Sequence, residues 1–424
     1  MKRNLLFVSL MLLAVSCSDD ANNGNGQIKT NSDNFTEMTI PANFAWKMTT
    51  DVTCNFTSEG HMSMVFLYLP NSSDSFASFY VGKGIDPAIV NLPVVSSSVI
   101  VKYQKETELS AATTLSVSNG VITFDVPSDS KDMNSVANVA PMMTKGDTNK
   151  PVIYYPATGM GTMMFEDLWP YYGDYDFNDM AFNYRIQMNL SKDNKVNQIF
   201  VTLRIASVGG SIPYDLYLQL NNVKGSQIGE AFKYSDKNSV NPTNIVQIKE
   251  GSYASEPALF RFDNIKENSK RPKGGSFLNT VKGYEISKSD MVEMSFFIDF
   301  DNGSTSFDIA DMGLDAFNFF IARKDITNNK YTEIHLGGQK PSSLGSADYD
   351  YLKGLSSQSN KSTNFYYSNT NLVWGVNVPA EIDHAYEGIV FTYAYPEFAA
   401  WAQSAGAVNQ DWYKHGETEH LVHK

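Results

Sequence analysis

MAFNYRIQMNL, residues 180–190, alternates apolar and polar side chains along most of its length. The apolar residues occupy the even positions from 180 to 188, whereas Asn, Arg and Gln occupy the odd positions from 183 to 189. A polar turn over residues 191–197 leads into a second alternating run, residues 199–205. Because neighbouring side chains of a strand point to opposite faces, the pattern predicts a β-hairpin with one buried face and one solvated face.

Runs of the same kind recur along the chain and indicate the fold class. Only residues 396–405 have helical spacing, and Pro396 suits a first helical turn. Short strands separated by turn residues are typical of sandwiches. We therefore predict an all-β protein with two β-sandwich-like domains, mostly antiparallel, and one short C-terminal helix. The other strand-like runs are residues 52–56, 61–69, 98–105, 121–126, 214–220, 292–300 and 316–323.

Changes in composition divide the chain into segments. The residues before position 37 are first apolar and then mostly Asn, Asp, Gly and Ser, with almost nothing to bury. The predicted segments are a signal peptide (1–16), a lipidated cysteine with a flexible tether (17–36), a small β-sandwich domain (37–127), a linker (128–149), a larger β domain (150–415) and a polar tail (416–424).

The amino terminus carries the features of an export signal. Lys2 and Arg3 precede an apolar run, residues 5–15, which is too short for a permanent membrane helix. The end of this run and the two residues after it read LAVSC, residues 13–17, which resembles the lipobox of bacterial lipoproteins. In a lipobox the cysteine, here Cys17, is acylated. The alternative is an ordinary signal peptide with a chance cysteine. The acidic residues after Cys17 resemble the surface-export signal of Bacteroidetes lipoproteins, so we expect a lipid-anchored protein of the outer membrane, at the cell surface.

Charge and cysteine content exclude two classes of protein. The 424 residues include 46 acidic and 33 basic ones, for a net charge of −13. This balance argues against a nucleic-acid partner, because phosphates require a basic surface. Two cysteines are too few for a disulfide scaffold. Cys54 lies in a strand-like run and is expected to be a buried apolar residue.

The stretch FEDLWPYYGDYDFNDM, residues 165–180, is the densest acidic segment. It holds five carboxylates and one Asn between positions 166 and 179, without Lys or Arg. Two carboxylates about 4 Å apart repel by roughly 4 kcal/mol at an effective dielectric constant of about 20, so a folded cluster needs a cation, a proton or distance. Ca²⁺ prefers such oxygen ligands. The predicted Ca²⁺ ligands are Asp174, Asp176, Asn178 and Asp179, helped by Glu166 or Asp167.

This segment is not an EF-hand, although Asp174, Asp176 and Asn178 match the first three ligand positions of an EF-hand loop. Asp179 stands where the loop glycine is required and Arg185 where the bidentate glutamate is required. The alternative to a calcium loop is a solvated turn in which Asp174 and Asn178 make local hydrogen bonds to the backbone.

Other clusters are weaker candidates. A second acidic patch could be a separate ion site, the far wall of the first, or a hairpin tip with incidental acids. The C-terminal tail could chelate zinc if ordered, but it also fits solvated chain. His335 is expected to be a strand residue with an ordinary hydrogen bond. The patch comprises Asp299, Asp301, Asp308, Asp311 and Asp315, and the tail group comprises His415, Glu417, His420 and His423.

The aromatic residues beside the acids bear on function. Trp169, Tyr171, Tyr172 and Tyr175 could form flat platforms for a glycan next to the ion, or could pack in the core. The sequence lacks common hydrolase, metalloprotease, phosphate-loop and dinucleotide motifs. We therefore expect a binding or adhesion module for a glycan or protein ligand, without catalysis. The alternatives are a structural envelope component without a small ligand and a glycan-active hydrolase.

Four segments carry a resemblance to a known family. EDLWPYYGDYDFNDMAFNYRI (166–186), IHLGGQKPSS (334–343), NLVWGVNVP (371–379) and AYPEFAAWAQSAGAVNQDWY (394–413) resemble, in order, parts of the LruC domain of bacterial lipoproteins and surface proteins. The resemblance covers roughly residues 150–413. It implies a location in the cell envelope and a domain of unknown biochemical activity.

Overall fold

The computed structural model describes residues 33–135, 151–239, 244–265, 277–300, 305–325, 329–359 and 364–423. The predicted signal peptide, Cys17 and most of the tether lie outside the described residues, as do Asp301 and most of the predicted linker. Within the described ranges, no helix combines the length and the apolar character needed to cross a bilayer.

Strands make up most of the described regular structure. They are β1 (Thr49–Ser58), β2 (Ser63–Tyr68), β3 (Ala77–Val81), β4 (Ala88–Pro93), β5 (Ser98–Tyr103), β6 (Thr113–Ser116), β7 (Val121–Val126), β8 (Val152–Tyr155), β9 (Gly161–Phe165), β10 (Met180–Leu190), β11 (Lys195–Ser207), β12 (Asp215–Lys224), β13 (Ile228–Lys237), β14 (Ile245–Gln247), β15 (Pro257–Phe262), β16 (Glu293–Phe300), β17 (Phe307–Asp308), β18 (Phe317–Lys324), β19 (Tyr331–His335) and β20 (Gly375–Val378). The helices are α1 (Asp33–Thr36), α3 (Ser346–Lys353), α4 (Phe391–Ala394) and α5 (Phe398–Gln403), with 3₁₀ turns η1 (Gly225–Gln227), η2 (Lys288–Asp290), η4 (Ile309–Met312), η5 (Leu314–Ala316), η6 (Trp412–Lys414) and η7 (Thr418–His420).

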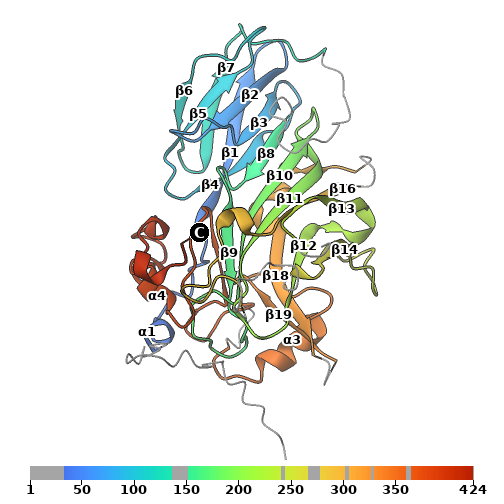
Figure 1. Cartoon of the computed structure of the whole chain (residues 1–424). Helices are drawn as coiled ribbons and strands as arrows, with labels where there is room; N and C mark the ends of the chain where they lie inside the picture. The colour runs from blue at the N-terminus through green and yellow to red at the C-terminus, as the bar shows by residue number, and fades with distance from the viewer. Residues whose placement is uncertain are drawn as a thin grey trace, which may run out of the picture.

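The strands form three sheets, which confirms the predicted all-β, mostly antiparallel fold (Figure 1). A twelve-stranded sheet has the order β13-β16-β11-β10-β8-β3-β2-β5-β6, with β9, β17 and β20 attached to it. A five-stranded sheet has the order β14-β15-β12-β18-β19, and β1 lies between β4 and β7 in the third. Among the described strand pairs, only β1 and β7 run parallel.

Aromatic contacts show which sheets pack face to face. Phe182 of β10 lies 5.7 Å from Phe319 of β18, measured between ring centroids, so the five-stranded sheet covers part of the large one. In the amino-terminal region Phe56 of β1 lies 5.7 Å from Phe79 of β3, which joins the three-stranded sheet to the large one. Cys54 on β1 is 1% exposed, as expected, and burial raises the pKa of its thiol.

The predicted hairpin is present as β10 and β11, with Tyr184 opposite Leu203. Its even-numbered apolar residues are buried, as predicted. The odd-numbered face is not solvated, because Asn183 is fully buried and only Arg185 on β10 is partly exposed. Residues of the C-terminal region pack over the end of this face at Ala181, which the local pattern could not indicate.

The large sheet runs through both predicted domains. Ala77 and Ser78 of β3 pair with Ile153 and Val152 of β8, so strands from either side of the predicted linker are hydrogen-bonded neighbours. One hydrophobic cluster contains residues from both regions. The two sandwich-like regions therefore share a sheet and a core.

Both ends of the described chain are more ordered than the sequence suggested. The last four residues of the predicted tether form α1, where Phe35 is fully buried. In the predicted polar tail, Leu421 and Val422 are buried, and the Val422 N–H donates to the carbonyl of His384 at 3.0 Å. In each case an apolar side chain within a polar segment finds a place in the core. Helix α5 lies in the predicted helical range, whereas α1, α3 and α4 were not expected.

Candidate metal centre

The acidic segment forms the loop that joins β9 to β10. These strands pair antiparallel, with Phe165 opposite Met180. The pairing places Glu166 and Asp179, the residues that follow and precede the strands, on facing ends of the loop. The carboxylate of Asp179 accepts a hydrogen bond from the backbone N–H of Asp167 at 2.8 Å. The hairpin geometry thus gathers acids from both ends of a 14-residue segment.

Three of the predicted ligands converge. Glu166, Asp174 and Asp176 each offer a carboxylate oxygen, and these oxygens lie within 4.8 Å of one another. Glu166 is fully buried, Asp176 is 1% exposed and Asp174 is partly buried. The side chains therefore point inward to a shared centre rather than outward as in a solvated turn.

Backbone groups hold two of these carboxylates in place. The oxygens of Glu166 accept hydrogen bonds from the N–H groups of Phe177 at 2.6 Å and Tyr175 at 3.2 Å. Those of Asp176 accept from the N–H groups of Asn178 at 3.0 Å and Gly388 at 2.9 Å. Each carboxylate oxygen has more than one lone pair, so these bonds leave acceptor capacity for an ion.

The remaining predicted ligands lie beside this group, against two glycines. A methyl group on Gly210 would collide with the carboxylate of Asp167 and lie 2.9 Å from that of Asp179. One on Gly209 would collide with the side-chain oxygen of Asn178. That oxygen is buried and has no hydrogen-bond partner among the described residues. A buried amide oxygen without a donor is costly, and a cation would satisfy it.

Electrostatics in the loop disfavour ionised acids without a counter-ion. Burial, followed by neighbouring carboxylates, raises the pKa values of Glu166, Asp176 and Asp179 well above their ordinary range. Partial desolvation and the charge of Asp174 raise the pKa of Glu387 to about 7. The folded loop thus favours either bound protons or a bound cation.

Sequence reasoning missed Glu387 and the glycines at 209, 210 and 388. Glu387 and Gly388 come from the segment before α4, more than 200 residues from the loop, and no local signal links them to it. The adjacent Gly209 and Gly210 follow β11, and a glycine pair after a strand can indicate a close backbone approach.

The predicted aromatic platforms are mostly core residues. Trp169 is 3% exposed and stacks on Tyr349 at 5.4 Å, and Tyr175 is fully buried. Tyr172 is partly buried, and only Tyr171, at 50% exposure, presents a surface. The prediction of a four-residue glycan platform is therefore wrong for Trp169 and Tyr175, because residues distant in sequence cover their rings.

The second acidic patch does not gather into a site among the described residues. Asp308 forms an ion pair with Lys195, and Asp315 forms one with Lys47. Asp299 is buried in β16, where Gln198 donates to it at 3.0 Å. Asp311 is exposed on η4. Lysines from other parts of the chain thus pair with two of these acids, and the described acids of the patch face different partners.

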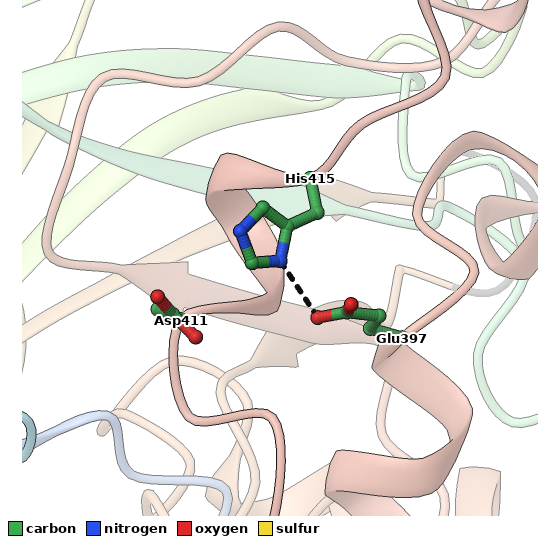
Figure 2. A group of neighbouring side chains, drawn as sticks. All are labelled: Glu397, Asp411 and His415. Atoms are coloured by element: carbon green, nitrogen blue, oxygen red, sulfur yellow. Dashed lines mark hydrogen bonds and ion pairs between the residues drawn. The ribbon is translucent and has the colours of Figure 1, made fainter.

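The predicted tail group also fails to converge as a whole. His415 forms a cluster with Glu397 and Asp411, residues outside that group (Figure 2). Its Nδ1 lies 2.8 Å from Glu397, whose hydrogen bond raises the pKa of His415. The Lys414 ammonium lies 3.8 Å from Asp411 and adds a positive charge. This exposed group is an ion-pair cluster.

The other histidines have backbone or buried partners. His420 donates to the carbonyl of Tyr393 at 3.0 Å, and His423 donates to that of Thr418 at 2.8 Å. His335 is fully buried between Asn318 and Glu333, at 2.9 and 3.0 Å, and burial lowers its pKa. His335 thus has a hydrogen-bonded strand position, as expected.

Comparison with known proteins yields one family and one fold. A family model described as a domain of unknown function (DUF4842) matches residues 194–413. The matched range includes the C-terminal segments that carried the LruC resemblance but begins after the acidic loop, and the LruC name is not confirmed. No curated protein matches the chain.

A solved structure shares the fold. It is the crystal structure of a "putative lipoprotein" from Bacteroides ovatus, with a TM-score of 0.63 and 20% identity. The match covers 85% of this chain and 99% of that one. At this level of identity the likeness shows a shared fold.

Proposed function

We infer the role of this chain from its own residues, because it belongs to the DUF4842 family, whose function is unknown. The proposed protein is a lipid-anchored envelope protein with a Ca²⁺-stabilised β domain. On this proposal it acts as a non-catalytic binding or adhesion module at the outer surface of the outer membrane.

The observation that carries the calcium proposal is the convergence of Glu166, Asp174 and Asp176. Ca²⁺ binds oxygens at about 2.3 to 2.6 Å, so ligands on opposite sides of one ion lie roughly 5 Å apart. The three carboxylate oxygens, within 4.8 Å of one another, fit that range. The orphaned side-chain oxygen of Asn178 and the nearby Asp179 supply further oxygen chemistry beside the group.

Burial of the acids favours a structural ion over catalysis. Glu166 and Asp176 are almost completely inaccessible and are bonded to backbone N–H groups. A polymeric substrate cannot reach such groups, whereas an ion can neutralise them. The burial of Trp169 and Tyr175 likewise favours an ion that orders the loop rather than one that presents a glycan.

Thermal unfolding with calcium and with chelator tests the ion site. An ion at a hundred times its Kd stabilises the fold by about 2.7 kcal/mol, which should raise the Tm by several degrees. The Asp176→Asn variant should lose this shift, since it removes a central charge. Asp411 is an acid in the exposed cluster of Figure 2, outside the proposed calcium site. The Asp411→Asn variant should therefore keep the calcium-dependent shift in Tm. Coincident wild-type curves in calcium and chelator would refute the calcium proposal.

The anchor is tested separately. LAVSC at residues 13–17, followed by Ser18, Asp19 and Asp20, supports acylation and surface export. A Cys17→Ser variant should appear in the soluble fraction, whereas the wild type should fractionate with outer membranes and be digested by protease added to intact cells. Retention of the variant in membranes would contradict the lipid anchor.

A further inference from the structure

We propose that the calcium loop is a latch that holds the first described segment of the chain, an inference that rests on the proposed calcium site and, for its effect at the membrane, on the proposed lipid anchor. The latched segment, residues 33–48, precedes β1 and is called the strap. It lies beside the C-terminal helices in Figure 1, where α1 is near α4. Its apolar residues belong to one cluster with residues of α4, α5 and the acidic loop.

Phe35 makes the contact between the strap and the loop. Its ring stacks on Tyr175 with centroids 4.2 Å apart and an angle of 13° between the planes. It meets the edge of Phe177 at 5.7 Å and stacks on Phe398 at 5.9 Å. The side chain has no exposed surface, and two of these three ring contacts are made by the loop.

The same two loop residues serve both the acids and the strap. Tyr175 and Phe177 each donate a backbone N–H to Glu166 and each place a ring against Phe35. The carbonyl of Tyr175 also accepts the N–H of Phe391, which ties the loop to α4. A shift of the loop that moves the acids must therefore also move the platform for Phe35.

Loss of the ion should loosen the start of the strap rather than all of it. Without a cation the buried acids repel one another, and the backbone at Tyr175 and Phe177, which donates to Glu166, relaxes. The later strap residues keep other ties, since the Trp46 indole N–H donates to the carbonyl of Asn371 at 3.0 Å. On the proposed lipid anchor at Cys17, release of α1 would add residues 33–36 to the chain between the anchor and the folded domain. Calcium would then set how far the domain stands from the membrane.

Hydrogen exchange on the mature protein, with calcium and with chelator, tests the latch. The backbone N–H of Met38, which donates to the carbonyl of Phe35 at 3.2 Å, should exchange at least tenfold faster in chelator. Exchange in β5, which lies next to the edge strand β6 of the large sheet, should change little. The Asp176→Asn variant should show the fast rate in both conditions. Calcium binding is measured on the same samples by equilibrium dialysis.

Linkage supplies a reciprocal test with a matched control. If calcium favours the docked strap, removal of the docked side chain must weaken calcium binding, because coupling between two sites is mutual. Phe35→Ala should lower calcium affinity at least tenfold. Phe124→Ala removes an aromatic side chain of β7 that contacts Phe56, and should leave the affinity unchanged.

The outcomes separate the latch from the calcium site itself. If calcium binds but Met38 exchanges equally fast in both conditions, the latch is wrong and the calcium site stands. An unchanged affinity in Phe35→Ala leads to the same conclusion. If no calcium binds to the wild type, both proposals fail. Should Phe35→Ala not fold, the exchange measurement on the wild type still decides.

Discussion

At the scale of single residues, the acidic centre depends on glycines as much as on acids. A β-carbon on Gly210 would collide with the carboxylate of Asp167 and crowd that of Asp179. A β-carbon on the neighbouring Gly209 would collide with the side-chain oxygen of Asn178. These close approaches allow the carboxylates and the amide to pack against bare backbone. The acids can then lie side by side without side chains between them.

A Gly210→Ala variant should therefore be destabilised and bind calcium more weakly. Overpacking of a tight site costs about 1 to 3 kcal/mol, and the displaced carboxylates would leave their positions. A Gly313→Ala variant is the control, because its β-carbon would meet only the tip of Asp51, at 3.3 Å. Unfolding in denaturant and calcium titration measure both effects. Equal behaviour of the two variants would contradict the role given to Gly210.

Local sequence was enough to expect that several acids of the loop lie together, but it did not indicate what surrounds them. Glu166, Asp174 and Asp176 could be grouped because one loop carries them and the flanking strands pair. The partners of Trp169 could not be foreseen, since Tyr349 is 180 residues away in the chain. The same holds for Glu387, whose relation to the loop is set by the fold of the C-terminal region.

At the scale of elements, period-2 patterns were reliable and short amphipathic segments were not. The strands β10 and β11 were evident because alternation continues over many residues. Helix α3 buries only Tyr349 and Leu352 in an otherwise polar sequence, too few apolar positions to show a helical period. Strand patterns also do not reveal what covers an outer face, which is why the polar face of β10 was expected to be solvated.

Isolated apolar residues in polar segments proved to be the informative signal at both chain ends. Phe35 in the predicted tether and Val422 in the predicted tail are fully buried. Composition averages over such segments suggest free chain, because one apolar residue changes the average little. Each of these residues nevertheless fixes a short element against the C-terminal core.

At the scale of the whole molecule, the sheet joins the two regions that the sequence separates. β3 pairs with β8, so β2, β3, β8 and β10 are successive hydrogen-bonded strands of one sheet. The common core includes Val90 from the amino-terminal region and Ile186 from the other. A boundary crossed by strand pairing and by core contacts differs from the exposed linkers that usually separate domains.

We therefore expect the two regions to unfold together in urea. Cys54 reports on the amino-terminal region, because its buried thiol should react with a thiol reagent only after β1 opens. Tryptophan fluorescence reports on the C-terminal region, where Trp374 and Trp412 are fully buried. In a Cys17→Ser background, both signals should change at the same urea concentration, as in a cooperative transition. Thiol reactivity that appears well before the fluorescence change would instead show two independently folding domains, and the shared sheet would then be only a weak connection between them.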